Sequence, residues 1–310
     1  MDWSVFISSL LSAGTRMAIP IAYAGIGVVL IEKAGVLNIG CESQMLIGAF
    51  ISFYVTYTTH NILLGILSGA VAGMLFATIV AYLCISRRQD QSVVGIVFNI
   101  FTVGLTSFLY RALFGTTAAS PSVDKLPQIS IPGLSKISYI GDIFFNQTIL
   151  FYILIVIAFV LWFAMFKLKI GLKMRAVGEN PRAAQAAGID VIRYRYVVLM
   201  IGGALAGIGG AYLSCGIMGQ FTENMSAGRG FIALAVTALS RWNPLLALVS
   251  SYVFGIADAL QLRLQAFGVE IPYQFMLMLP YILTLISLVI IGRGVRAPKS
   301  LGMVFKKEGR

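Results

Sequence analysis

Charged residues are scarce in this chain, at 11% of 310 residues, and its mean hydropathy is +0.89. Soluble domains carry about 25% charged residues, so this composition excludes an ordinary water-soluble fold. Runs without any charge recur near the length of ~20 residues that a helix needs to cross a bilayer; they cover 92–110, 143–166, 196–222 and 271–292. None alternates in the manner of a membrane β-barrel strand, and a backbone in lipid is otherwise satisfied only by helices. The sequence therefore predicts an all-α, polytopic transmembrane helical bundle.

Groups for metal binding and catalysis are also few. The chain has one histidine, His60, and three cysteines, Cys41, Cys84 and Cys215, which lie in or beside apolar segments without the spacing of metal ligands. We interpret the cysteines as small buried apolar residues. The sequence offers no Ser-His-Asp arrangement and no pair of carboxylates, so we expect no catalytic site, no metal site and no enzyme activity.

Basic residues outnumber acidic ones by 23 to 12, which gives a net charge of +11. Seven lie within 167–195 and six within 293–310, whereas 111–147 is almost neutral. Cytoplasmic loops of membrane proteins carry an excess of Lys and Arg, whereas external loops do not. The distribution therefore indicates membrane lipid rather than nucleic acid as a partner. We predict one transmembrane domain over 1–292, with an extracytoplasmic segment at 112–147, a cytoplasmic loop at 167–195 and a basic cytoplasmic tail at 293–310. The outer segment is long enough to meet a binding protein, and an ordered plug or a plain linker are equal alternatives.

The apolar segments give eight crossings when they are counted from the cytoplasmic loop, and we expect eight to ten spans in two pseudo-repeated halves. Each half contains an interrupted segment, "EKAGVLNIGCESQMLIGAF" at 32–50 and "SAGRGFIALAVTALSRWNP" at 226–244. Interrupted helices in matching positions of two halves indicate a transport pathway, and tight packing of small residues is the alternative. We assign "GGALAGIGGAYLSCG" at 202–216 to such packing.

Polar side chains inside spans are costly to bury and are therefore candidates for the pathway. We expect Asn38 and Glu42 near the first interruption, where Glu42 either stabilises the first turn of its own helix or takes part in gating. Asn99 either binds a substrate hydroxyl or base edge, or bonds a neighbouring helix. Asp258 is a further candidate, and we expect it to pair with Arg263, five residues further on.

Aromatic side chains offer stacking surfaces in the same spans. Phe98 and Phe231 could stack on a base, and ordinary packing is the alternative for each. Arg229, which precedes the short apolar piece of the second half, is expected to be solvated, and attraction of the substrate or contact with a binding protein is the alternative. The spans hold no strong cluster of charge, which favours a neutral hydroxylated or aromatic solute over an ion or an amino acid.

A short polar stretch, "VGENPRAAQAAGID" at 177–190, stands out in the basic loop. Asn180 is a favourable N-cap, Pro181 suits the first helical position, and Gly188 suits the position just past a helix end. Such a helix is too short to be stable alone, so we expect its alanines to dock it in a groove of a partner. The predicted docking residues are Gly178, Glu179, Asn180, Pro181, Arg182, Ala183, Ala184 and Gly188.

This stretch resembles the coupling helix of ABC-importer permeases, whose loose signature is E-A-A, three residues, then G; Arg182 stands here in place of the usual Glu. Together with 32–50 and "RGFIALAVTALSRWNP" at 229–244, it resembles the branched-chain amino acid/ribose/nucleoside type of permease, and within it the simple-sugar and nucleoside subgroup. The resemblance covers roughly 15–292. Small departures are Ser43, where a Gly is usual, and Cys41, where a larger apolar residue is common.

The resemblance implies a permease subunit of an ABC importer in the cytoplasmic membrane, which moves nucleosides by alternating access. It implies three protein partners: a cytoplasmic ATPase, a second and different permease subunit, and an extracytoplasmic substrate-binding protein. The chain has no G-x-x-x-x-G-K-S/T phosphate-binding loop, so no cofactor is expected here and ATP would bind to the partner ATPase. Simple sugars or branched-chain amino acids are alternative substrates, and a stand-alone secondary transporter is an alternative class.

Overall fold

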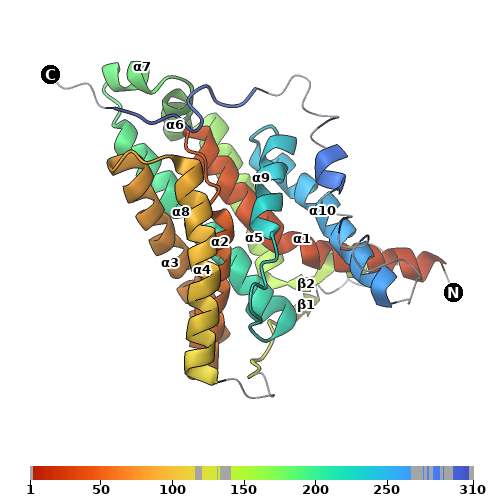
Figure 1. Ribbon diagram of the computed structural model, residues 1–310. Helices are drawn as coiled ribbons and strands as arrows, with labels where there is room; N and C mark the ends of the chain where they lie inside the picture. Colours follow the sequence, from red (N-terminus) through yellow and green to blue (C-terminus); the bar gives the residue numbers. More distant parts are fainter. Residues whose placement is uncertain are drawn as a thin grey trace.

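The computed structural model describes residues 3–115, 121–130, 132, 141–266, 275, 278, 282–286, 289 and 296–306. Helices dominate it, as the composition predicts (Figure 1). In chain order the elements are α1 (Trp3–Lys33), α2 (Cys41–Thr59), α3 (Ile62–Ala81), η1 (Tyr82–Ser86), α4 (Gln91–Phe114), β1 (Gln128–Ser130), η3 (Gly141–Phe145), β2 (Asn146–Thr148), α5 (Ile149–Lys167), α6 (Lys169–Glu179), α7 (Pro181–Ala186), α8 (Val191–Ala211), η4 (Tyr212–Met218), α9 (Arg229–Leu239) and α10 (Pro244–Ala266).

Six helices in the described part of the chain are long and apolar enough to cross a membrane. They are α1, α3 continued by η1, α4, α5, α8 continued by η4, and α10. The 19-residue α2 lies buried among them, and α9 is the short apolar helix that we expected in the second half. Most of the span expected at 271–292 lies outside the described residues. The polytopic helical class is therefore confirmed.

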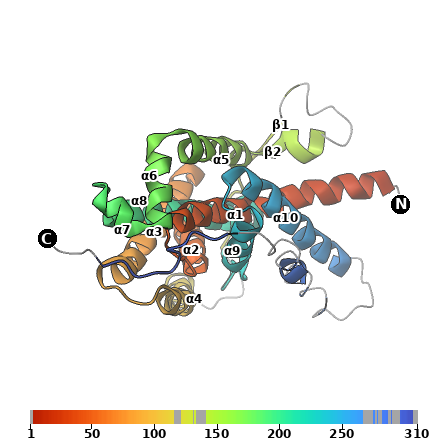
Figure 2. The same cartoon turned by 90° about the horizontal axis from the view of Figure 1, so that it is seen from above.

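Helices α1, α2 and α8 form the centre of the bundle, and α4 and α5 lie on opposite sides of it (Figure 2). The most apolar windows of α1 and α8 are 89% and 72% buried, whereas those of α4 and α5 are 28% and 22% buried. The outward faces of α4 and α5 carry large apolar side chains such as Ile100, Phe108 and Val156. Exposed aliphatic and aromatic groups on peripheral spans are suited to contact lipid.

The small residues of 202–216 bring α8 close to its neighbours, as expected. A Cβ added at Gly48 of α2 would lie 2.5 Å from Gly207 Cα, and one added at Gly73 of α3 would lie 2.8 Å from the same atom. Side chains at these positions would push the helices apart, so the glycines permit the close packing that membrane helices use in place of a hydrophobic driving force.

We call the end of the bundle that carries the α2–α3 turn, β1 and β2 the outer end, and the end that carries α6 and α7 the inner end, following the predicted charge asymmetry. At the outer end β1 pairs with β2 in an antiparallel ribbon, a small departure from an all-helical chain. Residues 121–127 lie against η4, because the Val123 N–H donates to the Gly219 carbonyl at 2.8 Å and the Leu126 N–H to the Cys215 carbonyl at 3.1 Å. Residues 121–127 are therefore attached to the bundle, and the role of the outer segment stays a prediction.

Candidate functional site

Glu42 joins the two interrupted segments. Its buried carboxylate accepts hydrogen bonds from the backbone N–H groups of Gly228, at 2.8 Å, and Gly230, at 2.6 Å. These N–H groups belong to the start of α9, where a helix leaves its donors unpaired and favours a negative charge. Glu42 also lies in the first turn of α2, as we expected, but its hydrogen bonds stabilise a helix of the other half.

Asn99 of α4 stabilises the turn that precedes α2. Its side-chain carbonyl accepts the Ser43 N–H at 3.0 Å, and its amide donates to the Ile39 carbonyl at 3.0 Å. Beside it, the side chains of Asn38 and Gln44 bond each other reciprocally at 3.0 and 3.2 Å. Both asparagines thus use their polar groups in hydrogen bonds within the protein. For Asn99 this corresponds to the predicted alternative of a bond to a neighbouring helix. Their contact with a substrate stays a prediction.

Asp258 pairs with Arg229. The sequence predicts instead that Asp258 pairs with Arg263 and that Arg229 is solvated, and both predictions are wrong. An Arg229 guanidinium nitrogen lies 3.2 Å from an Asp258 carboxylate oxygen, and the side chains are only 16% and 9% exposed. Arg263, the expected partner, instead donates to the Ser9 hydroxyl at 2.8 Å on α1. A left-handed Ala227 and Gly228 turn the chain immediately before Arg229, so this residue begins α9 inside the bundle and is not solvated. The ion pair fixes the start of α9 to α10.

The two phenylalanines predicted for stacking lie in different surroundings. Phe98 of α4 packs edge-on against Phe76 and Phe101, at centroid distances of 6.1 and 6.3 Å. Phe231 is 45% exposed and follows Gly230 in the first turn of α9. Phe231 therefore presents an uncovered ring next to the Glu42 contact, whereas Phe98 is held in a packing cluster. Whether either ring touches a substrate stays a prediction.

Sequence reasoning missed a group of rings at the outer end. We call it the outer aromatic cluster, in which the centroids of neighbouring rings lie 5.2–6.5 Å apart. It comprises Phe50, Phe53, Tyr54 and Tyr57 of α2, Tyr110 and Phe114 of α4, and Phe221 of the 219–228 loop. The signal was present, because aromatic residues three or four positions apart share one face of a helix. The cluster closes the space between α2, α4 and the 219–228 loop.

A bidentate ion pair joins two of the elements that carry the outer aromatic cluster. The Arg111 guanidinium at the end of α4 donates to both oxygens of Glu223 in the 219–228 loop, at 2.8 and 3.0 Å. Arg111 lowers the pKa of the Glu223 carboxyl through these hydrogen bonds. The pair connects the two halves at the outer surface, as Glu42 connects them inside the bundle.

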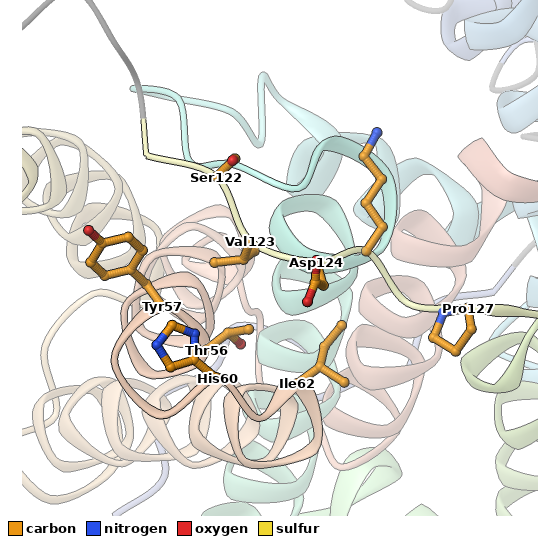
Figure 3. A pocket seen from close by; sticks show the side chains of 9 residues that line it. Thr56, Tyr57, His60, Ile62, Ser122, Val123, Asp124 and Pro127 are labelled. Atoms are coloured by element: carbon orange, nitrogen blue, oxygen red, sulfur yellow. The ribbon is translucent and has the colours of Figure 1, made fainter.

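A polar cavity of about 390 Å³ opens beside the outer aromatic cluster (Figure 3). The α2–α3 turn and the 122–127 segment supply its walls, with Asp124 pointing from the segment toward the turn; the lining residues are Thr56, Tyr57, His60, Ile62, Ser122, Val123, Asp124, Lys125 and Pro127. Its hydroxyl, imidazole, amine and carboxylate groups can bond a polar solute or polar side chains of a docked protein. Within the described residues, no three His, Cys, Asp or Glu side chains gather in a way that could hold a metal ion.

The polar stretch at the inner end forms α7, with the caps that the sequence predicts. The Asn180 side chain accepts the Ala183 N–H at 3.1 Å, and Pro181 occupies the first helical position. At the other end Gly188 has φ +80°, its N–H donates to the Gln185 carbonyl at 2.9 Å, and the Ile189 N–H donates to the Ala184 carbonyl at 3.0 Å. This pair of bonds is the Schellman motif, whose left-handed residue is best supplied by glycine.

The two faces of α7 differ. Ala184 is buried against Val177 and Val191, so it faces its own chain and is not available to a partner. Gly178 is also buried, inside α6. The exposed face of α7 carries Arg182, Ala183, Ala186 and Ala187 together with Gly188, and Glu179 is exposed just before it. The expected docking surface is therefore narrower than we predicted.

Comparison with known proteins decides the family. A family model described as "Branched-chain amino acid transport system / permease component" matches residues 10–288. The chain is a permease of this family. It is thus a multi-pass membrane subunit of an ABC transporter and not an enzyme, as its sequence predicts. No solved structure matches this permease.

Three relatives are similar over most of the permease. The guanosine ABC transporter permease protein NupQ of Bacillus subtilis is 37% identical over 100% of both chains. The nucleoside ABC transporter permease protein NupC of Lactococcus lactis is 37% identical over 93% of this chain and 94% of its own. The protein named "Putative glucose ABC transporter permease protein TsgC13" of Haloferax volcanii is 36% identical over 86% of this chain and 80% of its own. The permease is therefore of the sugar and nucleoside importer type.

Proposed function

We propose that this permease imports nucleosides. The observation that carries the proposal is the 37% identity to a guanosine permease over the full length of both chains. A second nucleoside permease matches over 93% of this chain, whereas the glucose relative matches over 86%. Phe231, half-exposed beside the Glu42 contact, offers a ring that can stack on a base.

ATP hydrolysis on a separate ATPase would drive the cycle. The exposed face of α7, from Arg182 to Gly188, is our proposed docking surface for that ATPase. Its alanines allow close approach of a partner groove, and the caps at Asn180 and Gly188 hold the helix in shape. The polar cavity and the Arg111–Glu223 pair at the outer end are available to an extracytoplasmic binding protein. We infer a second, different permease subunit, in accord with the family resemblance.

In alternating access, the outer closure and the inner contacts must open in turn. In this structure the outer aromatic cluster packs α2 and α4 against the 219–228 loop, and the Arg111–Glu223 pair joins α4 to the same loop. We propose that the Glu42 contact and the Arg229–Asp258 pair hold α9 beside the pathway. Asn38 and Asn99 act with them by fixing the turn before α2, and Phe98 and Phe231 are the candidate stacking residues.

A stand-alone secondary transporter would need an acid free to bind a coupling ion. In the described helices that span or cross the bundle, the acids are Glu32, Glu42 and Asp258, and each is engaged. Glu32 accepts the Trp242 indole N–H at 2.7 Å, Glu42 accepts the α9 donors, and Asp258 pairs with Arg229. This favours an importer powered from outside the chain.

Uptake of labelled solutes tests the substrate. Cells that lack this chain and cells that carry it on a plasmid are given labelled guanosine or labelled glucose in parallel. We expect guanosine uptake to depend on the chain and glucose uptake to be equal in the two strains. Dependence of glucose uptake alone would retain the importer and overturn the nucleoside assignment.

A further inference from the structure

The basic tail that we predicted as a cytoplasmic extension is packed into the inner end. Residues 296–306, which we call the inner strap, cross the inner end of the bundle near α6 and α7 (Figure 1). Ser300 is only 2% exposed, and its hydroxyl and N–H both donate to the Gly178 carbonyl, at 2.7 and 3.0 Å. The strap is therefore attached to α6, the helix that leads into α7.

The strap also touches the turn between α1 and α2. A Cβ added at Gly35 would collide with the Ser300 hydroxyl, and it would lie 3.3 Å from Gly178 Cα and 3.2 Å from an Arg195 nitrogen. Gly35 has φ +80°, a conformation that favours glycine. Three segments far apart in the sequence thus meet at Ser300. This turn leads directly to Asn38 and Glu42 at the first interruption.

Arg195 of α8 holds the strap from below. It is 2% exposed, and its guanidinium donates to the Met303 carbonyl at 3.1 Å and to the Ser300 hydroxyl at 3.4 Å. The guanidinium also lies over the Phe305 ring, 5.9 Å from its centroid. No described carboxylate forms an ion pair with it. A buried cation without a counter-ion is costly, and an apolar side chain could fill the same space, so the cost indicates a role beyond packing.

Phe305 completes the path to α7. Its ring packs on the cluster formed by Val177, Ala184 and Val191, and Ala184 is the buried residue of α7. A displacement of α7 would press on Phe305 and, through Arg195 and Ser300, on the turn at Gly35. Packed and hydrogen-bonded contacts of this kind are able to carry energetic coupling between distant sites.

We propose that the inner strap transmits movement of α7 to the first interruption, with Arg195 and Ser300 as its positioning residues. This rests on the proposed function, because the ATPase must move α7. The strap connects the ATPase-facing helix to the turn at 34–40. From there Glu42, whose carboxylate bonds the start of α9, carries the movement to that helix.

The test compares Ser300→Ala and Arg195→Met with Lys299→Ala, a change at an exposed strap residue. Each complete importer, with ATPase, second permease and binding protein, is reconstituted in liposomes, and guanosine uptake is divided by ATP hydrolysed. We expect hydrolysis to persist while this ratio falls about fivefold or more in the first two variants, the size of ordinary allosteric coupling. Lys299→Ala should match the wild type, and Arg195→Lys should recover part of the ratio because it keeps a donor.

A second measurement keeps the proposal falsifiable if a variant assembles poorly or the solute is not guanosine. Hydrogen exchange of the peptide covering 34–43 is compared between nucleotide-free and vanadate-trapped importer. We expect trapping to change this exchange in the wild type and not in Ser300→Ala. Equal changes in both, or uptake and hydrolysis that fall in proportion, would overturn the strap. A wild-type importer that fails to take up guanosine while its exchange still responds would instead overturn the substrate assignment.

Discussion

Replacing Glu42 by glutamine removes the charge that joins the two halves while keeping the size of the side chain. The carboxylate accepts from Gly228 and Gly230 at 2.8 and 2.6 Å. Glutamine keeps one acceptor oxygen and turns an NH₂ donor toward the other N–H group. One of the two donors is therefore left without an acceptor; the Gly230 N–H is buried, whereas Gly228 is only partly buried.

The cost follows from these contacts. A lost hydrogen bond to a charged acceptor costs about 1.5–3 kcal/mol, and loss of the negative charge at the start of α9 adds about 0.3–2 kcal/mol. The neutral amide is easier to bury than a carboxylate, which offsets part of the loss. We therefore expect the free energy of unfolding to fall by about 2 kcal/mol. With the entropy of about 2.1 cal/mol/K per residue known for soluble domains, this loss in a chain of 310 residues corresponds to a melting temperature lower by about 3 °C.

Thermal melting of the purified protein in detergent measures this change, and solute uptake measures its effect on transport. Asp142→Asn, which neutralises an exposed acid at the outer end, is the matched control and should melt like the wild type. We expect Glu42→Gln to lose more uptake than its folded amount explains, because α9 is no longer held. An unchanged melting temperature together with normal uptake would refute the role given to Glu42.

Three further predictions follow from other contacts. Ala183→Glu, on the exposed face of α7, should abolish ATP-driven uptake with little change in melting temperature, and co-purification of the ATPase measures the lost docking; retained co-purification and uptake would contradict it. Asp258→Asn leaves Arg229 buried without its counter-ion, so melting should show a loss of about 3 kcal/mol or more, and a stable variant would speak against the pair. The pKa of Glu223 is lowered by Arg111 from its usual 4.5, so the outer ion pair should persist above that pH and be lost as pH falls through the lowered pKa. Hydrogen exchange of the 219–228 loop, divided by the intrinsic exchange rate at each pH, checks this. Protection of the loop that does not change with acid, or with Arg111→Met, would exclude it.

The helices could be predicted from sequence because their signals are local. Apolar length alone placed the span at 92–110, which the structure extends to Gln91–Phe114. The caps of α7 were also predictable, since Asn180, Pro181 and Gly188 act within one or two turns. Similarly, the glycines of 202–216 indicated close packing before the neighbouring helices were known.

The contacts of the site were not predictable, because they join residues far apart in the chain. Glu42 bonds a residue 188 positions away, and no spacing rule indicates that partner. Proximity in sequence favoured Arg263 for Asp258, yet Arg263 turns to Ser9 and leaves Arg229 as the partner. The tail appeared only as a basic segment, so its docking through Ser300 carried no signal of its own.

The most direct test of the central claim uses the complete importer reconstituted in liposomes. The binding protein is supplied on the side of the membrane that the outer end faces, and ATP is supplied on the opposite side, where the ATPase lies. We predict that labelled guanosine accumulates against its gradient only when ATP is hydrolysed, and that glucose neither accumulates nor competes with it. Accumulation of glucose in place of guanosine would contradict the assignment of substrate. Guanosine transport that proceeds without the ATPase would contradict the importer itself.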